Sequence, residues 1–154
     1  MSSTEDTVTL ISGANLGGMV AWSADGNNHK DDPETEQAVT AKAAIAERTA
    51  NWSSKNGGKL SEEQMSTIKL PTAYDIAEAV GQTFSGSSIR GLPTWLTSYS
   101  KAPIVYGYWT STPYAEYSFH AWRVASDGYV GYGFVDYDGG SGVRPVITIS
   151  KSNV

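Results

Sequence analysis

The strongest constraint on the fold is the Asp-Gly dipeptide at residues 127–128, which stands between two alternating segments. HAWRVAS (residues 120–126) precedes it and YVGYGFV (residues 129–135) follows it. Asp-Gly in this position is typical of a tight β-hairpin, because these residues tolerate the positive φ that two-residue turns require. We therefore expect two antiparallel strands joined by a short turn. Other β-branched and aromatic runs predict strands at residues 103–111 and 142–150.

A long helix is predicted in the first half of the chain. Asp32 can serve as its N-cap, and Pro33 follows at the first helical position. The Ala-rich residues 34–52 continue the helix, and the glycines of SSKNGG end it. One face of this helix carries the small apolar residues Val39, Ala43, Ala46 and Ala50.

A second, shorter helix is predicted from Thr72 to Gly81, because Thr72 and Asp75 form a capping-box pattern. Residues 7–12 alternate as a strand, and a short strand is expected to end near Trp22. Helices thus come before most of the antiparallel strands. This order predicts an α+β fold with two helices, a twisted antiparallel sheet and long irregular loops.

The totals limit the possible classes of protein. A chain of 154 residues fits a single domain, residues 7–154, after a disordered tail, residues 1–6. The net charge of −5 argues against a nucleic-acid partner. Without cysteine there is no disulfide, thiolate metal site or cysteine nucleophile. No apolar run is long enough to insert into a membrane, and the polar start MSSTEDTV does not resemble a signal peptide.

The core is predicted from the large apolar residues of the late strands. These residues are Trp109, Trp122, Val124, Val143 and Val146. Arg144 lies among them, and we expect it to make a structural ion pair or a backbone contact. Pro145 predicts an edge position or a bulge in the last strand, because proline cannot donate a ladder hydrogen bond.

The stretch DGYVGYGFVDYDGGSGVRPV (residues 127–146) has an unusual composition. It is rich in Tyr, Gly, Asp and Ser and poor in aliphatic residues. Seven of the nine tyrosines of the chain lie between Tyr106 and Tyr137. Tyr provides amphipathic contact area at low entropic cost, and Gly and Ser let the backbone adapt, as in antibody paratopes. The composition therefore indicates a contact surface held by the strand GVRPVITI.

The second half of the chain also resembles a known family. LPTAYDIAEAV, YWTST, AWRV, DGYV and GVRPVITI, in this order between residues 70 and 150, resemble the C-type lectin-like fold. More narrowly, they resemble the variable proteins of diversity-generating retroelements and the formylglycine-generating-enzyme branch of that fold. The first third of the chain carries no motif of the family.

In the retroelement family, Asn codons of the type AAY are diversified to NNY, which cannot encode Glu, Lys, Gln, Met or Trp. None of these five residues occurs from Val124 to Ser150. Glu116 would therefore be fixed. The variable, ligand-binding face is assigned to Tyr114, Tyr117, Ser118, Phe119, His120, Tyr129, Gly131, Tyr132, Gly133, Phe134, Asp136, Tyr137, Asp138, Gly139, Gly140 and Ser141.

The resemblance implies a binding module without catalysis, whose face recognises a protein ligand or receptor on a target cell. It also implies display on a virion or cell surface. Two alternatives remain open. Tyr and Trp could stack on sugar rings in a carbohydrate-binding domain, or the chain could be a non-binding structural domain of a viral tail or surface protein.

Other chemistry finds little support in the sequence. Asp127, Asp136 and Asp138 could bind calcium, but the lectin motifs EPN and WND are absent, so turn or contact roles are favoured. His29 and His120 lie far apart and lack a metal or acid–base pattern. The cysteines that formylglycine-generating enzymes use are missing. We therefore expect no catalytic residue, no metal and no cofactor.

Overall fold

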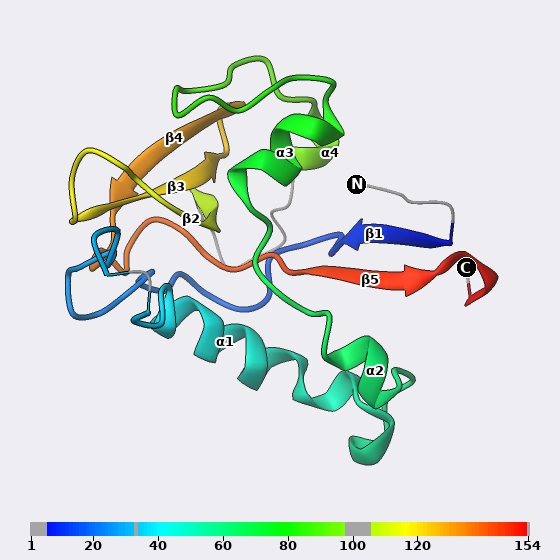
Figure 1. Cartoon of the computed structure of the whole chain (residues 1–154). Coiled ribbons are helices and arrows are strands. Elements are labelled where there is room, and N and C mark those ends of the chain that lie inside the picture. Colours follow the sequence, from blue (N-terminus) through cyan, green and yellow to red (C-terminus); the bar gives the residue numbers. More distant parts are fainter. Residues whose placement is uncertain (1–5, 33, 98–105, 154) are drawn as a thin grey trace.

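The computed structural model describes residues 6–32, 34–97 and 106–153. The predicted α+β class is confirmed: the described residues contain four α-helices and two antiparallel sheets (Figure 1). The predicted tail, residues 1–6, lies outside them except for Asp6. The carbonyl oxygen of Asp6 accepts a hydrogen bond from the Lys151 amide at 3.0 Å.

The first sheet joins the two ends of the chain. β1 (Thr7–Ile11) pairs antiparallel with β5 (Val146–Ser150), with Thr7 opposite Ser150 (Figure 1). The prediction of one sheet built from the late strands was therefore wrong. Strand β5 begins after Pro145, whose carbonyl oxygen accepts the Ser12 amide at 2.9 Å, so proline ends the ladder here.

The second sheet has the order β2-β3-β4. Its strands are β2 (Gly107–Pro113), β3 (His120–Ala125) and β4 (Tyr129–Phe134). The predicted hairpin between β3 and β4 is confirmed, and Gly128 has a φ of 97° in its turn. The first part of the predicted strand at residues 103–111 lies outside the described residues.

The strand predicted to end near Trp22 does not form. The segment instead runs beside residues 135–143 through spaced hydrogen bonds from the amides of Leu16, Val20 and Trp22. Gly17 has a φ of 68°, so the backbone turns between Leu16 and the residues that lead to Trp22. Its bonds nevertheless fix the start of the chain against the second sheet.

The long helix begins later than predicted. α1 (Val39–Thr49) starts after Ala38, which has a φ of 54° and provides no side-chain cap. Asp32 is not the N-cap, because its carboxylate accepts the Thr35 hydroxyl in a turn, and Pro33 lies outside the described residues. The helix also buries the neighbouring face, consisting of Ala41, Ala44, Ile45 and Thr49. The face predicted from Val39, Ala43, Ala46 and Ala50 is not the buried one.

Shorter helices connect the two sheets. The capping box of Thr72 and Asp75 is confirmed at the start of α3 (Ala73–Ala79). The helices α2 (Glu62–Met65) and α4 (Thr94–Thr97) were not predicted. Single-turn 3-10 helices occupy Ala50–Trp52, Ser54–Asn56 and Lys151–Asn153.

The second sheet separates two apolar clusters. Tyr108 and Trp122 pack with α3 on one side, and Trp109 packs with α1 on the other. The prediction of a buried core at Trp109, Trp122, Val124, Val143 and Val146 is confirmed. Arg144 is buried as well. As expected, it makes backbone contacts, donating to the carbonyl oxygens of Ser12, Trp95 and Leu96 at 2.6–3.0 Å.

Candidate functional site

Aromatic side chains gather at the end of the second sheet that lies beyond Trp122. Strand pairing places Tyr132 opposite Trp122 and Phe134 opposite His120, so all four lie on one side of the sheet. The loop between β2 and β3 adds three more rings to this side. We call this set the aromatic face; it consists of Tyr114, Tyr117, Phe119, His120, Tyr132 and Phe134.

The rings of the aromatic face form one continuous stack. The ring centroids of Tyr114 and Tyr132 are 4.5 Å apart, those of Tyr117 and Phe119 are 5.4 Å apart, and those of Phe119 and Phe134 are 6.0 Å apart. Four of these five side chains are nevertheless exposed, from 43% for Phe119 to 56% for Phe134. The rings thus support one another while leaving a broad apolar surface open to solvent.

His120 lies at the centre of the face. Its ring centroid is 4.6 Å from that of Phe119, 4.7 Å from Phe134 and 4.9 Å from Tyr132. Its Nδ1 atom is buried and has no hydrogen-bond partner among the described residues. This burial lowers the pKa of His120 below its usual range, so the imidazole is neutral at pH 7.

The face is attached to the core through Trp122. The Trp122 ring meets Tyr114 and Tyr132 edge-to-face, at centroid distances of 5.3 and 5.7 Å. On the other side it meets Phe84 at 5.0 Å. Trp122 is only 3% exposed. The exposed rings therefore rest on a residue that the fold holds fixed.

Asn28 holds the loop that carries half of the face. This side chain is fully buried, and its Nδ2 group donates to the carbonyl oxygens of Tyr114 (3.0 Å), Tyr117 (2.9 Å) and His120 (2.6 Å). The Asn28 amide also donates to the carbonyl oxygen of Ser118. Sequence reasoning missed Asn28, because its acceptors lie 86–92 residues away and the local pattern indicates only a turn.

The turn around Asn28 is itself ordered by Asp25. The carboxylate of Asp25 accepts hydrogen bonds from the Asn27 amide (2.9 Å), the Ser23 hydroxyl (2.8 Å) and the His29 ring (2.7 Å). The Asn27 amide, followed by His29 and Ser23, lowers the pKa of Asp25 to about 2. Asp25 therefore stays ionised at pH 7, and the turn presents Asn28 to the loop.

Tyr129 does not join the aromatic face. It is three residues from Tyr132 on β4, so its side chain lies on the opposite side of the sheet. Its ring lies over Gly131, and the guanidinium of Arg90 is 5.7 Å from the ring centroid. Tyr129 is half-buried and Gly131 is buried. The predicted variable face is therefore divided between two sides of the sheet.

A smaller pocket of about 250 Å³ lies beside the aromatic face. Trp109, Arg123, Gly133 and Tyr137 are among the residues that line it. A Cβ atom at Gly133 would lie 3.1 Å from Nε of Arg123, so glycine leaves room for this guanidinium. Within the described residues, the Arg123 side chain has no hydrogen bond or ion pair. Arg123 was not predicted, although arginine beside aromatic residues is typical of binding sites.

The turn after β4 contains the rest of the predicted positions. Asp136, Tyr137 and Asp138 are exposed, and Gly139 is half-buried, as is Ser118 in the loop between β2 and β3. Two further predicted positions, Gly140 and Ser141, are buried together with Gly131. These three are not part of the exposed surface.

None of the four glycines assigned to the variable face has a positive φ. Gly131, Gly133, Gly139 and Gly140 all lack it, so a larger residue would meet side chains and not strained backbone. A Cβ atom at Gly139 would lie 2.9 Å from the Tyr137 ring. Substitutions there would displace a tyrosine that covers the glycine.

No metal-ligand cluster is assembled in the described part of the chain. This part contains no group of three or more His, Asp or Glu side chains that could hold a metal ion. Asp127, Asp136 and Asp138 are all exposed. The described helices are also too short or too polar to cross a bilayer. Comparison of the chain with protein-family models, curated proteins and solved structures finds no match.

Proposed function

We propose that this protein is a ligand-binding module without catalytic activity, and that the aromatic face is its contact surface for a protein ligand. The observation that carries the proposal is the continuous stack of exposed rings on a rigid sheet. Exposed apolar patches of this kind mark interaction sites, and aromatic residues dominate the energetics of protein interfaces.

The fixed arrangement of the side chains in the aromatic face favours tight binding. Its rings are stacked on one another, its loop is held by Asn28, and its base is Trp122. Binding then costs little additional side-chain entropy, because the contact groups are already in place. Arg123 lines the pocket beside the face, although strand pairing places its side chain on the opposite side of the sheet from the stacked rings, and it offers a charged anchor for an acidic group of the ligand.

We further propose that the chain is a variable protein of a diversity-generating retroelement with a C-type lectin-like fold. The support is the order of the motifs, the NNY-compatible residues from Val124 to Ser150 and the exposure of Tyr117, Phe119 and Phe134. Gly131, Gly140 and Ser141 are left out of the contact set, because they are buried. Display on a virion or cell surface follows from the resemblance. A reverse-transcriptase gene next to a near-copy of codons 108–149 would test this family assignment.

The binding proposal is tested with a face variant and a matched control. The face variant replaces Tyr117, Phe119 and Phe134 by Ser, and the control is Tyr106→Ser, which changes a residue of similar exposure (58%) outside the face. Wild type and both variants are applied to arrays of purified cell-surface proteins and of glycans. We expect a protein bound by wild type and control, and bound at least about tenfold more weakly by the face variant.

Three outcomes would contradict this proposal. Ligands that bind the face variant as well as wild type would place the contact surface elsewhere. A fall of many degrees in the melting temperature of the face variant would show that the rings hold the fold together and are not a free surface. Glycan binding that the face variant loses would replace the protein ligand by a carbohydrate.

A further inference from the structure

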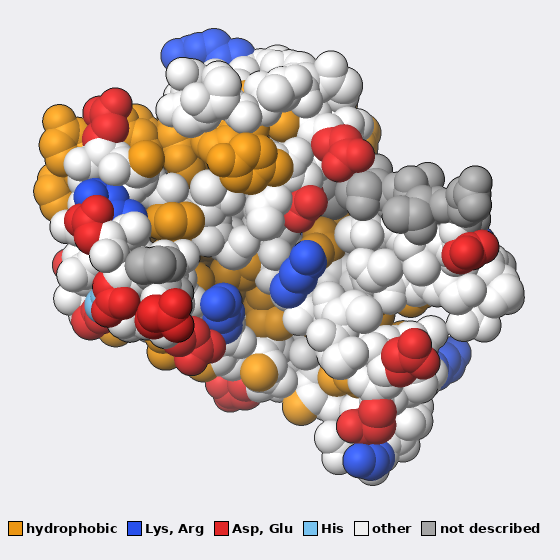
Figure 2. Space-filling model, viewed as in Figure 1, with side chains coloured by type: hydrophobic (Ala, Val, Ile, Leu, Met, Phe, Trp, Pro, Cys, Tyr) orange, Lys and Arg blue, Asp and Glu red, His pale blue; other side chains and the backbone are white. Residues whose placement is uncertain are grey.

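A second, larger cavity lies away from the aromatic face. It has a volume of about 590 Å³ and lies between α1, the segment that leads from α2 to α3, and β2. Pockets that bind small molecules measure about 300–1,000 Å³. Figure 2 shows a hollow in this region, with hydrophobic side chains in it and both basic and acidic side chains around it. The cavity therefore has the size and the lining of a small-molecule site.

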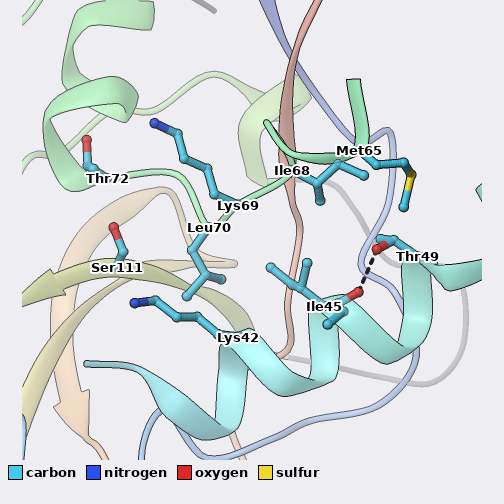
Figure 3. A pocket seen from close by; sticks show the side chains of 10 residues that line it. Lys42, Ile45, Thr49, Met65, Ile68, Lys69, Leu70, Thr72 and Ser111 are labelled. Atoms are coloured by element: carbon cyan, nitrogen blue, oxygen red, sulfur yellow. Dashed lines mark hydrogen bonds between the residues drawn. The ribbon is translucent and has the colours of Figure 1, made fainter. Parts of the chain in front are cut away.

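The lining is divided into an apolar end and a polar end. Ile45, Met65 and Ile68 form the apolar end, and Leu70 lies between the two ends (Figure 3). Lys42, Lys69, Thr72 and Ser111 lie at the other end. The two ammonium groups thus stand with the hydroxyl groups of Thr72 and Ser111 at one end of the cavity, whereas the other end is mainly apolar apart from Thr49, so a ligand would have to be amphipathic.

Both lysines of the cavity are exposed, and neither is ion-paired within the described residues. Within the described residues, neither Lys42 nor Lys69 has an ion pair or a hydrogen bond from its ammonium group. None of the described residues that line the cavity is acidic, although the chain has 16 Asp and Glu residues. Two like charges beside one cavity repel each other, and an anion between them would relieve this repulsion.

The polar end is preformed by backbone contacts. Lys69 exchanges two hydrogen bonds with Val146 of β5, at 3.1 and 2.8 Å. The Ser111 amide donates to the carbonyl oxygen of Pro71 at 2.9 Å, and Thr72 caps α3. Lys42 lies on α1, next to the helical turn that provides Ile45. Both lysines thus project from fixed backbone, which reduces the entropic cost of binding.

We propose that this cavity binds a small amphiphile with one carboxylate or similar anionic group. The anionic head lies between Lys42 and Lys69, and the apolar tail lies along Ile45, Ile68 and Met65. The site is independent of the aromatic face, so neither proposal depends on the other.

The test uses octanoate as the probe and octanol as its uncharged counterpart. Each is titrated into the protein while the methyl NMR signals of Ile45, Ile68 and Met65 are recorded. We expect saturable shifts with octanoate and much weaker binding of octanol. Lys42→Ala combined with Lys69→Ala should weaken octanoate binding about tenfold or more and leave octanol binding unchanged. The control Lys151→Ala removes an exposed lysine outside the cavity and should have no effect.

A second variant tests the apolar end. Ala46 lines the cavity but is exposed, so Ala46→Phe should fill the cavity without unfolding the protein. It should abolish the octanoate shifts. The proposal is overturned if octanoate leaves the three methyl signals unchanged, or if either variant binds octanoate as well as the Lys151→Ala control does.

An anionic lipid bilayer offers the same head and tail chemistry. Sedimentation with phosphatidylglycerol vesicles distinguishes binding to such a bilayer from binding of a free amphiphile. We expect the protein to stay in the supernatant. Sedimentation that disappears in the double-lysine variant would assign the site to a membrane surface and overturn the proposal of a free ligand.

Discussion

Asn28→Ala tests most directly how the aromatic face is held in place. The buried Nδ2 group of Asn28 reaches three carbonyl oxygens of the loop between β2 and β3, those of Tyr114, Tyr117 and His120. Its Oδ1 atom accepts the Lys30 amide at 3.0 Å. Alanine removes these side-chain bonds and keeps the backbone bond to Ser118, so the change isolates the side chain.

The expected loss follows from the number of bonds. Two hydrogens on Nδ2 and one acceptor on Oδ1 amount to three hydrogen bonds, each with a net contribution of about 1 kcal/mol. Carbonyl oxygens that stay buried without a donor add to this loss. We therefore expect Asn28→Ala to reduce the free energy of unfolding by about 3–4 kcal/mol. For a chain of this length, that corresponds to a melting temperature roughly 6–16 °C lower.

Urea denaturation of Asn28→Ala and of the control Asn27→Ala measures this loss. Asn27 is exposed in the same turn, and its Oδ1 accepts only the His29 amide, at 2.8 Å. The control should lose about 1 kcal/mol or less. In Asn28→Ala, the Tyr114 amide, which bonds to the His120 carbonyl oxygen, should also exchange its hydrogen faster. Equal stability of the two variants would refute the conclusion that the Asn28 side chain holds the loop.

Two further predictions concern the base and the centre of the aromatic face. Trp122→Ala should cost about 3–5 kcal/mol in urea denaturation, because it empties a site that is 3% exposed between Phe84 and the exposed rings; a loss below about 1 kcal/mol would contradict this. Because the folded-state pKa of His120 is lowered, its neutral form favours folding, and the stability of the protein should decrease as the pH falls below about 6.5. In His120→Gln, the melting temperature should decrease less as the pH falls. If the variant and the wild type show the same pH dependence of the melting temperature, the buried imidazole of His120 is not the cause of the decrease.

The parts of the fold that the sequence predicts correctly are those with local causes. The Asp127-Gly128 hairpin depends on two adjacent residues, and the α3 start depends on Thr72 and Asp75. The pairing of β1 with β5 has no such signal, because the partners come from opposite ends of the chain. The delayed start of α1 has none either, since Ala38 adopts a positive φ that alanine disfavours in isolation.

In the candidate site, too, the sequence predicts the features that have local causes and misses the others. The exposed rings of Tyr132 and Phe134 follow from composition and from the two-residue period of a strand, and that of Tyr117 follows from composition alone. The same period places Tyr129 on the other side of the sheet, which composition alone does not reveal. The hydrogen bonds of Asn28 reach distant segments, and the pocket that Arg123 lines is formed together with distant segments. A single sequence does not indicate contacts of this kind.

The way in which Asn28 holds the loop bears on whether the face can vary. Asn28 donates to carbonyl oxygens at three loop positions, and every amino acid carries a carbonyl oxygen. The side chains of Tyr114 and Tyr117, by contrast, meet mostly other rings of the same face. Substitution of these rings therefore removes contacts within the face but leaves the hydrogen bonds from Asn28 to the loop intact. Such a division would let one scaffold present many different surfaces.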